Sequence, residues 1–140
     1  MIKDNDVEVS VVCLVYNHEP YLRKCLDGFV MQNTNFKYEV LIHDDASTDN
    51  SAKIISEYAE KYPHIIIPTL QKVNQRSLGV GIIDDLLVPK SRGRYIAICE
   101  GDDYWCDDNK LQKQFDYMEQ HPGCSICLHN KHLLIIVPQK

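Results

Sequence analysis

The sequence predicts an α/β fold in which helices cover both faces of a mostly parallel sheet. Segments with strand-like and helix-like patterns alternate along the whole chain, which is typical of parallel sheets. The predicted strands are almost continuously apolar, as expected for strands that are covered on both faces. Acidic residues follow two of these strands, at the edge of the sheet where ligands of such folds bind.

The first half of the chain supplies two strands and two helices. Residues 7–16 are almost continuously apolar and form the first predicted strand. Pro20 suits the first turn of a helix, and apolar residues follow it with helical spacing. Residues 36–43 form the second strand. Capping residues cluster at 47–51 and open a second helix, which Pro63 ends.

The second half continues the alternation. Its predicted elements are a strand at 65–67, a polar loop at 71–81, a short helix from Ile82 that Pro89 ends, a strand at 95–99, a helix capped by residues 107–109 and a last strand at 125–128. The resulting order is βαβαβαβαβ, within a single domain of 140 residues and without an internal repeat or linker.

The composition excludes some classes of function. The chain is 44% hydrophobic, which fits a globular protein, and its net charge of −5 argues against a nucleic-acid surface, which needs a basic footprint. The polar, acidic start lacks the basic and apolar regions of a signal peptide. No apolar run is longer than six residues, whereas a membrane span needs about 20. We therefore expect a cytoplasmic protein, with peripheral association at the inner membrane face left open.

Six cysteines are present, although disulfides are not the default in a cytosolic chain. Cys13 and Cys99 lie inside apolar strands, where free cysteine behaves as a small buried hydrophobe. Residues 121–129 have two interpretations: a zinc site, or a turn at Pro122 and Gly123 followed by a strand. The segment lacks a second Cys-x-x-Cys, and its ligands are too close together to close a loop around zinc, which favours the turn.

Two acidic pairs are the centre of the sequence. Asp102 and Asp103 follow the strand at 95–99, and Asp44 and Asp45 follow the second strand in the same way. Crowded carboxylates repel one another, and a divalent cation with a polyanionic ligand relieves the repulsion. Neither a Gly-x-Gly-x-x-Gly motif after the first strand nor a Walker A motif is present. A bound diphosphate would therefore need a cation at Asp102 and Asp103.

Individual polar residues near these pairs have alternative interpretations. Asp45 can accept a hydrogen bond from a nucleobase N–H, and Tyr16 offers a ring for stacking. Turn formation and helix capping are the alternative for both acidic residues of the first pair, and this interpretation suits Asp49 better. Trp105 either packs against the next helix or walls a sugar site. Asp107 and Asp108 fit helix caps better than ligands.

Response-regulator receivers are a different class that also alternates strands and helices and binds magnesium through aspartates. Their acidic pair ends the first strand, whereas the pairs here end the second and fourth strands. The third predicted strand, at 65–67, carries no phosphoacceptor aspartate. The sequence therefore disfavours this class.

Three blocks of the chain resemble the signature of family-2 glycosyltransferases. The blocks are residues 9–17, 38–49 and 93–105, and the resemblance runs from about residue 7 to residue 122. It implies the A-type nucleotide-diphospho-sugar transferase fold. It also implies an inverting, metal-dependent transfer from a nucleotide-diphospho-sugar, with a UDP-sugar as the expected donor, to a saccharide or glycolipid acceptor in polysaccharide biosynthesis.

The resemblance also assigns residues. Asp102 and Asp103 would hold Mn²⁺ or Mg²⁺, and Glu100 stands where many members have aspartate. The implied nucleotide-sugar-binding residues are Leu14, Tyr16, Asn17, Asp44, Asp45, Arg76 and Asp102. Members usually continue well beyond the metal motif, and that half supplies the acceptor site and the catalytic base. The resemblance therefore implies a C-terminally truncated chain whose base is not identified, with a non-catalytic nucleotide-sugar-binding module as the alternative.

Overall fold

A six-stranded sheet lies at the centre of the described part of the chain, with the strand order β3-β2-β1-β4-β6-β5. The computed structural model describes residues 6–129 and 132–138, and the side chains of residues 6–128. The strands are β1 (Val7–Val15), β2 (Lys37–Asp44), β3 (Ile66–Leu70), β4 (Tyr95–Ile98), β5 (Cys127–His129) and β6 (His132–Pro138). The first four are parallel, and β6 is antiparallel to both β4 and β5.

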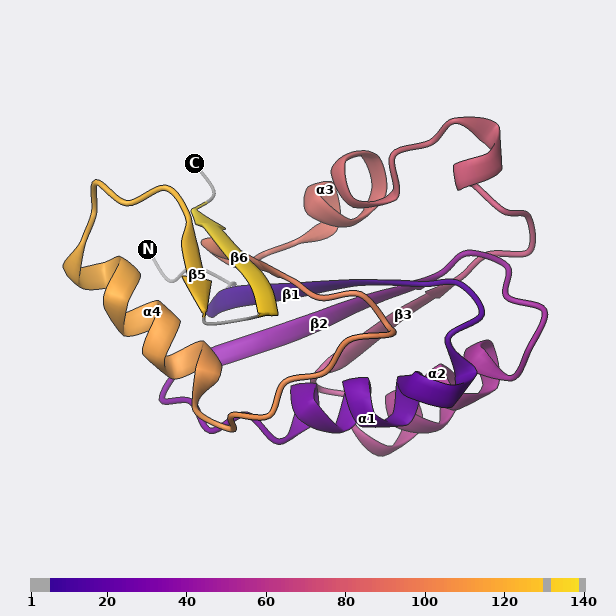
Figure 1. Ribbon diagram of the computed structural model, residues 1–140, viewed down its shortest axis with the longest axis horizontal. Helices are drawn as coiled ribbons and strands as arrows, with labels where there is room; N and C mark the ends of the chain where they lie inside the picture. Colours follow the sequence, from indigo (N-terminus) through magenta and orange to yellow (C-terminus); the bar gives the residue numbers. More distant parts are fainter. Residues whose placement is uncertain (1–5, 130–131, 139–140) are drawn as a thin grey trace.

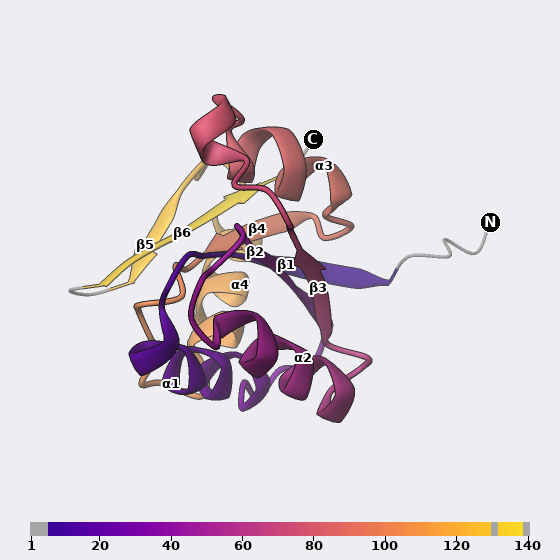
Figure 2. The ribbon, with the colours of Figure 1, turned by 90° about the vertical axis from the view of Figure 1, so that its right-hand side faces the viewer.

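Helices lie on both faces of this sheet, as the sequence predicted (Figure 1). The helical segments are α1 (Glu19–Val30), α2 (Ser51–Lys61), the 3₁₀ turn η1 (Arg76–Leu78), the π-helical η2 (Ile82–Leu87), α3 (Val88–Lys90) and α4 (Lys110–Gln120). The helices α1, α2 and α4 pack on one face, and η2 and α3 lie on the other (Figures 1 and 2). Within the described ranges, no helix is long and apolar enough to cross a membrane.

Two apolar clusters hold these layers together. The larger one joins β1, β2 and β4 to the three longer helices, and Leu22, Phe29 and Leu111 are fully buried in it. The smaller cluster, on the other face, consists of Val12, Leu41, Ile82, Leu87 and Ile96. Alternate residues of β1 and β2 enter opposite clusters because successive strand side chains point to opposite faces. This explains why apolar residues on both faces of the central strands are buried.

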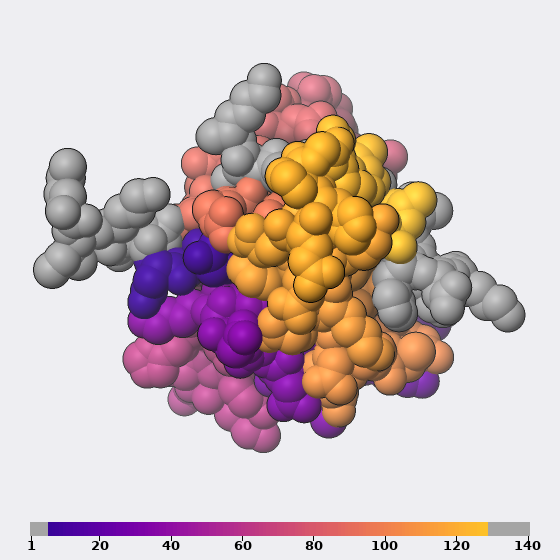
Figure 3. All heavy atoms as spheres, turned by 90° about the vertical axis from the view of Figure 1, so that its left-hand side faces the viewer, coloured from indigo at the N-terminus to yellow at the C-terminus, as the bar shows by residue number. Residues whose placement is uncertain are grey.

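The parallel pairing brings the carboxyl ends of the strands to one edge. In β1, Val11 lies opposite Val40 of β2 and Ala97 of β4. Figure 2 faces this edge, and Figure 3 shows the opposite end, where α4 and the segment after it lie beside the start of β1. The residues after β2 and β4 therefore emerge on either side of the end of β1.

A buried carboxylate fixes the amino end of the sheet. Glu39 Oε1 accepts hydrogen bonds from Ser10 Oγ at 2.7 Å and from the Arg92 amide at 2.8 Å. Arg92 Nε donates to Glu39 Oε2 at 2.8 Å, and the Gly93 amide donates to Ser10 Oγ at 2.8 Å. A Cβ on Gly93 would lie 2.5 Å from the Ser10 nitrogen, so only glycine fits where the chain enters β4.

Some predicted boundaries were wrong. The sequence predicted no strand after residue 128, but β6 inserts between β4 and β5, and Ala97 pairs with Ile136. The apolar run that forms β6 is much shorter than a membrane span, and the sequence did not predict it as a strand. Pro89 lies inside α3 instead of ending a helix, because proline is tolerated in a first helical turn. The strand β3 extends through Pro68 to Leu70, and proline is tolerated there because β3 is an edge strand.

Candidate functional site

The two acidic pairs flank the end of β1. The Asp45 amide donates to the Val15 carbonyl at 2.9 Å, and the Gly101 amide donates to the Leu14 carbonyl at 3.0 Å. These bonds extend the β1–β2 and β1–β4 ladders by a few residues. The pair after β2 and the pair after β4 are therefore held at the same edge, with β1 between them.

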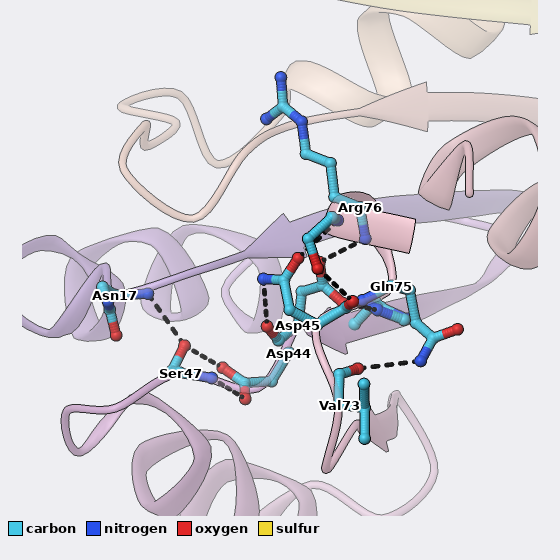
Figure 4. Close-up of polar contacts among 10 residues, drawn as sticks. Asn17, Asp44, Asp45, Ser47, Val73, Gln75 and Arg76 are labelled. Carbon is cyan, nitrogen blue, oxygen red and sulfur yellow. Dashed lines mark hydrogen bonds and ion pairs between the residues drawn. The ribbon is translucent and has the colours of Figure 1, made fainter. Parts of the chain in front are cut away.

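Asp44 is a structural residue of the turn that follows β2. Its carboxylate accepts hydrogen bonds from Ser47 Oγ at 2.5 Å and from the Ser47 amide at 3.1 Å (Figure 4). Ser47 Oγ also accepts a bond from the Asn17 amide at 2.9 Å. Asp44 is only 1% exposed. The interpretation of Asp44 as a turn-forming residue therefore describes its contacts, and direct contact with a nucleotide sugar stays a prediction.

Asn17 connects the end of β1 to the same turn. Its side-chain oxygen accepts hydrogen bonds from the Thr48 amide at 2.8 Å and from the Asp49 amide at 3.3 Å. Its φ of 53° lies in the left-handed region, which asparagine adopts more readily than most residues. Asn17 thus shapes the strand end, while the neighbouring Tyr16 side chain is 45% exposed. A role for either residue in base binding stays a prediction.

Asp49 binds the first residues of two helices. Its Oδ1 accepts from the Ser51 amide at 2.9 Å, and its Oδ2 accepts from the Glu19 amide at 3.1 Å. Burial would raise the pKa of the Asp49 carboxyl, but the bonds from Ser51 and Glu19 outweigh this effect and lower the pKa. The capping and turn interpretation of Asp49 is consistent with these contacts.

Asp45 organises the loop after β3. Its Oδ1 accepts from the Gln75 amide at 2.7 Å, and its Oδ2 accepts from the Arg76 amide at 3.1 Å (Figure 4). His43 Nε2 lies 3.3 Å from Oδ1, and Asn74 Nδ2 donates to the Asp45 carbonyl at 2.9 Å. Burial alone would raise the pKa of the Asp45 carboxyl, but the hydrogen bonds from the Gln75 and Arg76 amides and the contact with His43 hold this pKa below its usual value. Both carboxylate oxygens thus bind the protein itself, and acceptance from a nucleobase stays a prediction.

A pocket of about 270 Å³ lies beside this loop. Leu14, Arg76, Asp84 and Glu100 contribute to its lining, together with residues 80–83. The Arg76 side chain points away from Asp45, although its amide binds the Asp45 carboxylate (Figure 4). Two predicted site residues, Leu14 and Arg76, thus meet in one pocket.

The other predicted site residues lie around this pocket and not in its lining: Tyr16, Asn17, Asp44, Asp45, Asp102 and Asp103. A larger pocket of about 460 Å³ lies at the amino end of the sheet, beside Lys37, His64 and Arg92. It is remote from both acidic pairs, so its size does not mark it as the functional site.

The second acidic pair is exposed. The Asp103 amide donates to the Glu100 carbonyl at 3.0 Å and closes the turn, while the Asp102 side chain remains 46% exposed. A Cβ on Gly101 would lie 2.7 Å from His18 Nδ1 and 2.9 Å from Val15 Cγ2, so glycine allows the turn to pack closely against these two side chains. His18 Nε2 lies 4.0 Å from Asp102 Oδ2. Sequence reasoning missed His18, whose only signal was its place directly after Tyr16 and Asn17.

Three buried cysteines, Cys13, Cys25 and Cys99, lie in contact with one another beside this turn. Cys25 Sγ donates to the Glu100 carbonyl at 3.5 Å. Contact with Cys13 and burial raise the pKa of the Cys25 thiol, and contact with Cys25 and burial raise that of Cys99. These thiols are therefore protonated packing groups and not nucleophiles.

Trp105 packs in the core, as the first of its two interpretations predicts, and a role beside a sugar stays a prediction. It is 7% exposed, and its ring meets Phe29 edge-on at a centroid distance of 4.8 Å. A Cβ on Gly28 would lie 3.0 Å from the Trp105 carbonyl oxygen, so α1 and this segment are in close contact. Tyr104 is exposed instead, and Lys24 Nζ lies 3.9 Å from its ring centroid.

The donor set of the exposed turn fits a hard divalent cation. Asp102 and Asp103 supply carboxylate oxygens at the surface, which are the ligands that Mg²⁺ and Mn²⁺ prefer. Among the described residues, no group of three His, Cys, Asp or Glu side chains could hold a metal by itself. Mg²⁺ usually binds through one or two carboxylates together with substrate phosphates, so a site at Asp102 and Asp103 would need further ligands from a bound phosphate.

Comparisons with known proteins identify the family of this chain. Residues 10–132 match the model of the family described as glycosyl transferase family 2. An uncharacterised protein of Mycobacterium tuberculosis is 46% identical over 121 residues, which cover 86% of this chain and 34% of the relative. The chain thus spans about a third of the length of this curated relative.

Solved structures show the same fold. A fragment of S. aureus TarS in complex with UDP has a TM-score of 0.72 and 24% identity, over 95% of this chain and 38% of that one. The mannosyltransferase PcManGT from Pyrobaculum calidifontis, in complex with GDP-Man and Mn²⁺, has a TM-score of 0.75 and 20% identity, over 93% and 39%. The fold is therefore that of the A-type glycosyltransferases, and the chain belongs to glycosyl transferase family 2.

Proposed function

We propose that this chain is the donor-binding part of an inverting, metal-dependent glycosyltransferase. Its donor is a nucleotide-diphospho-sugar, with a UDP-sugar as the first candidate, and its acceptor is a saccharide or glycolipid. The observation that carries the proposal is the exposed Asp102–Asp103 turn, held at the same sheet edge as the pocket that Arg76 and Leu14 line. The solved structures with UDP and with GDP-Man and Mn²⁺ support this choice of donor class.

The residues of the site would divide the work of donor binding. Arg76 supplies a positive charge beside the pocket, and Tyr16 offers an exposed ring to a base. Asp103, with Asp102, would hold Mn²⁺ or Mg²⁺, whose charge offsets that of the donor diphosphate. Asp45 and Asn17 hold the two loops around the end of β1 in place. Exposure of the second pair thus matters, because a buried pair could not reach a ligand.

Three of the four carboxylates described after the acidic turn are engaged by other residues, and the fourth, Asp108, lies exposed just before α4, where the sequence predicts a helix cap. Asp107 binds the Asn109 amide and Lys113, Asp116 accepts from Gln112, and Glu119 pairs with Arg94. An inverting transfer needs a carboxylate that takes the acceptor proton, and loss of such a base typically lowers the rate by about 10²–10⁴-fold. We therefore expect this chain alone to transfer sugar very slowly, with slow donor hydrolysis as its main activity.

The alternative is a non-catalytic nucleotide-sugar-binding module, which the engaged carboxylates after the turn favour. Product release from UDP-sugars, measured with Mn²⁺ and a panel of acceptors, separates the two functions. A thermal-shift panel of UDP, GDP and dTDP with Mn²⁺ identifies the base. Stabilisation without turnover would favour the module, robust transfer would show that the chain carries its own base, and no shift with any nucleotide would contradict both.

A further inference from the structure

His43 is a buried histidine next to the loop-binding aspartate. It is the last but one residue of β2 and is fully buried. Side chains alternate along a strand, so His43 shares its sheet face with Leu41 of the smaller apolar cluster. This is the face that η2 covers, on the side of the pocket beside Leu14 and Arg76.

The ring of His43 makes one hydrogen bond. Its Nε2 lies 3.3 Å from Asp45 Oδ1, and an ionised carboxylate can only accept, so Nε2–H is the donor. Its Nδ1 is buried and has no hydrogen-bond partner among the residues that the structure describes. A buried polar atom without a partner destabilises a fold. An imidazole at this position is therefore best explained by what its Nε2–H does.

The Asp45 carboxylate connects His43 to the loop after β3. The same Oδ1 that faces His43 accepts the Gln75 amide at 2.7 Å, and Oδ2 accepts the Arg76 amide at 3.1 Å. The carboxylate can satisfy both amides only in one orientation, because each oxygen serves a different neighbour. The position of Arg76 at the pocket thus depends on how Asp45 is held.

We propose that His43 is a positioning residue of the donor site: it fixes the Asp45 carboxylate, which in turn holds the Gln75–Arg76 turn so that Arg76 faces the pocket. The inference rests on the proposed function for its ligand, a nucleoside diphosphate, but the positioning itself is a property of the ligand-free protein. His43 therefore acts through Asp45 and the loop, and does not touch the ligand.

Two variants separate this role from simple packing. His43→Leu fills the space without a donor, and His43→Gln keeps an N–H that can reach Asp45. By amide hydrogen exchange without ligand, the Gln75 and Arg76 amides should exchange about tenfold faster in His43→Leu, as a loss of about 1.4 kcal/mol would give. The same amides should regain protection in His43→Gln, and amides in β1 should not change in either variant.

The Kd of UDP with Mn²⁺ is the second readout. It should rise about tenfold in His43→Leu, in line with the same loss of loop order, and recover in His43→Gln. Unchanged protection of the Gln75 and Arg76 amides in a folded His43→Leu protein would overturn the positioning role. Absence of binding of UDP, GDP and dTDP by the unaltered protein would instead overturn the proposed function, while the exchange data would still decide the role of His43.

A measurement on the unaltered chain keeps the proposal testable if His43→Leu does not fold. The ¹⁵N chemical shifts and couplings of the His43 ring report which nitrogen carries a proton. The expected result is a proton on Nε2, directed at Asp45. A neutral ring with its proton on Nδ1 would contradict the proposed contact.

Discussion

The two acidic pairs have the same sequence pattern and opposite surroundings. Both follow an apolar strand and flank the end of β1. Asp44 and Asp45 are each 1% exposed, and their four carboxylate oxygens accept hydrogen bonds from the protein. Asp102 and Asp103 are exposed, and His18 Nε2 lies 4.0 Å from Asp102 Oδ2.

Acidic residues after a strand can therefore have two roles. One pair holds the loops of the site in place, and the other can bind the ligand. The buried pair orders the two loops that frame the end of β1, at 47–49 and 74–76. The exposed pair keeps its oxygens available, and Gly101 lets the turn pack closely enough to present them. Replacing residues of the first pair should therefore cost stability, whereas replacing residues of the second should cost ligand binding.

The largest effect is expected for Asp103→Ala. We predict that it abolishes metal-dependent binding of a nucleotide diphosphate and removes the stabilisation of about 2.7 kcal/mol that ligand at 100 times its Kd provides. The ligand-free fold should keep its free energy of unfolding or gain slightly, because one of several clustered negative charges is removed. Urea unfolding with and without UDP and Mn²⁺ measures both quantities. An unfolded Asp103→Ala protein would show that this aspartate is structural.

Asp45→Ala should instead lower the stability of the ligand-free protein. It removes the acceptor of the Gln75 and Arg76 amides, whose bonds to Asp45 are partly buried, so we expect a loss of about 2 kcal/mol in the free energy of unfolding. The matched control from the exposed pair is Asp102→Ala, which should change this free energy by less than about 0.5 kcal/mol. Equal losses in the two variants, measured by urea unfolding, would remove the contrast between the pairs.

Asp49→Ala should lower stability by about 1 kcal/mol, because it removes the acceptor of the Ser51 and Glu19 amides at the start of α2 and α1. Binding of UDP with Mn²⁺ should be kept, since Asp49 lies outside the exposed turn. Thermal unfolding and a UDP titration of the same sample measure the two effects. A large loss of affinity at unchanged stability would assign Asp49 to the ligand.

The smallest effect is a pH dependence of the loop that Asp45 holds. Because its hydrogen bonds lower the pKa of Asp45 in the folded protein, Asp45 contributes stability above its unfolded pKa of about 3.9. That contribution is lost as the pH falls through the lower, folded value. Below about pH 4, the Gln75 and Arg76 amides should lose exchange protection before the strands do. Protection that is constant through this range would contradict the assigned bonds.

The sequence predicted the central architecture because its signals are local. The continuous apolar pattern of β1 and β2 and the acidic turn after β4 are each readable within about ten residues. These signals predict that the residues after β2 and β4 lie at the same edge of the sheet. In the structure, the amides of Asp45 and Gly101 bind the end of β1. The strand β6 was missed because its pairing with β4 joins Ala97 to Ile136, a contact that neither segment indicates alone.

The contrast between the acidic pairs could not be read from the sequence. The bonds that bury Asp45 come from residues 30 and 31 positions away, and Asn17 binds a turn 30 to 32 positions away. Such contacts depend on the tertiary fold, while the local pattern of both pairs is the same. The one local signal for the Asp45 network was His43, which directly follows the apolar residues 40–42 of β2.

The central claim is that the exposed pair binds a divalent cation together with a nucleotide diphosphate. Isothermal titration of UDP into the unaltered protein, in Mn²⁺ and again in excess chelator, tests it most directly. We expect saturable binding of UDP in Mn²⁺ and none in chelator, because the acidic turn repels a bare diphosphate. Equal affinity under both conditions would contradict the account and show that the diphosphate is bound without the metal.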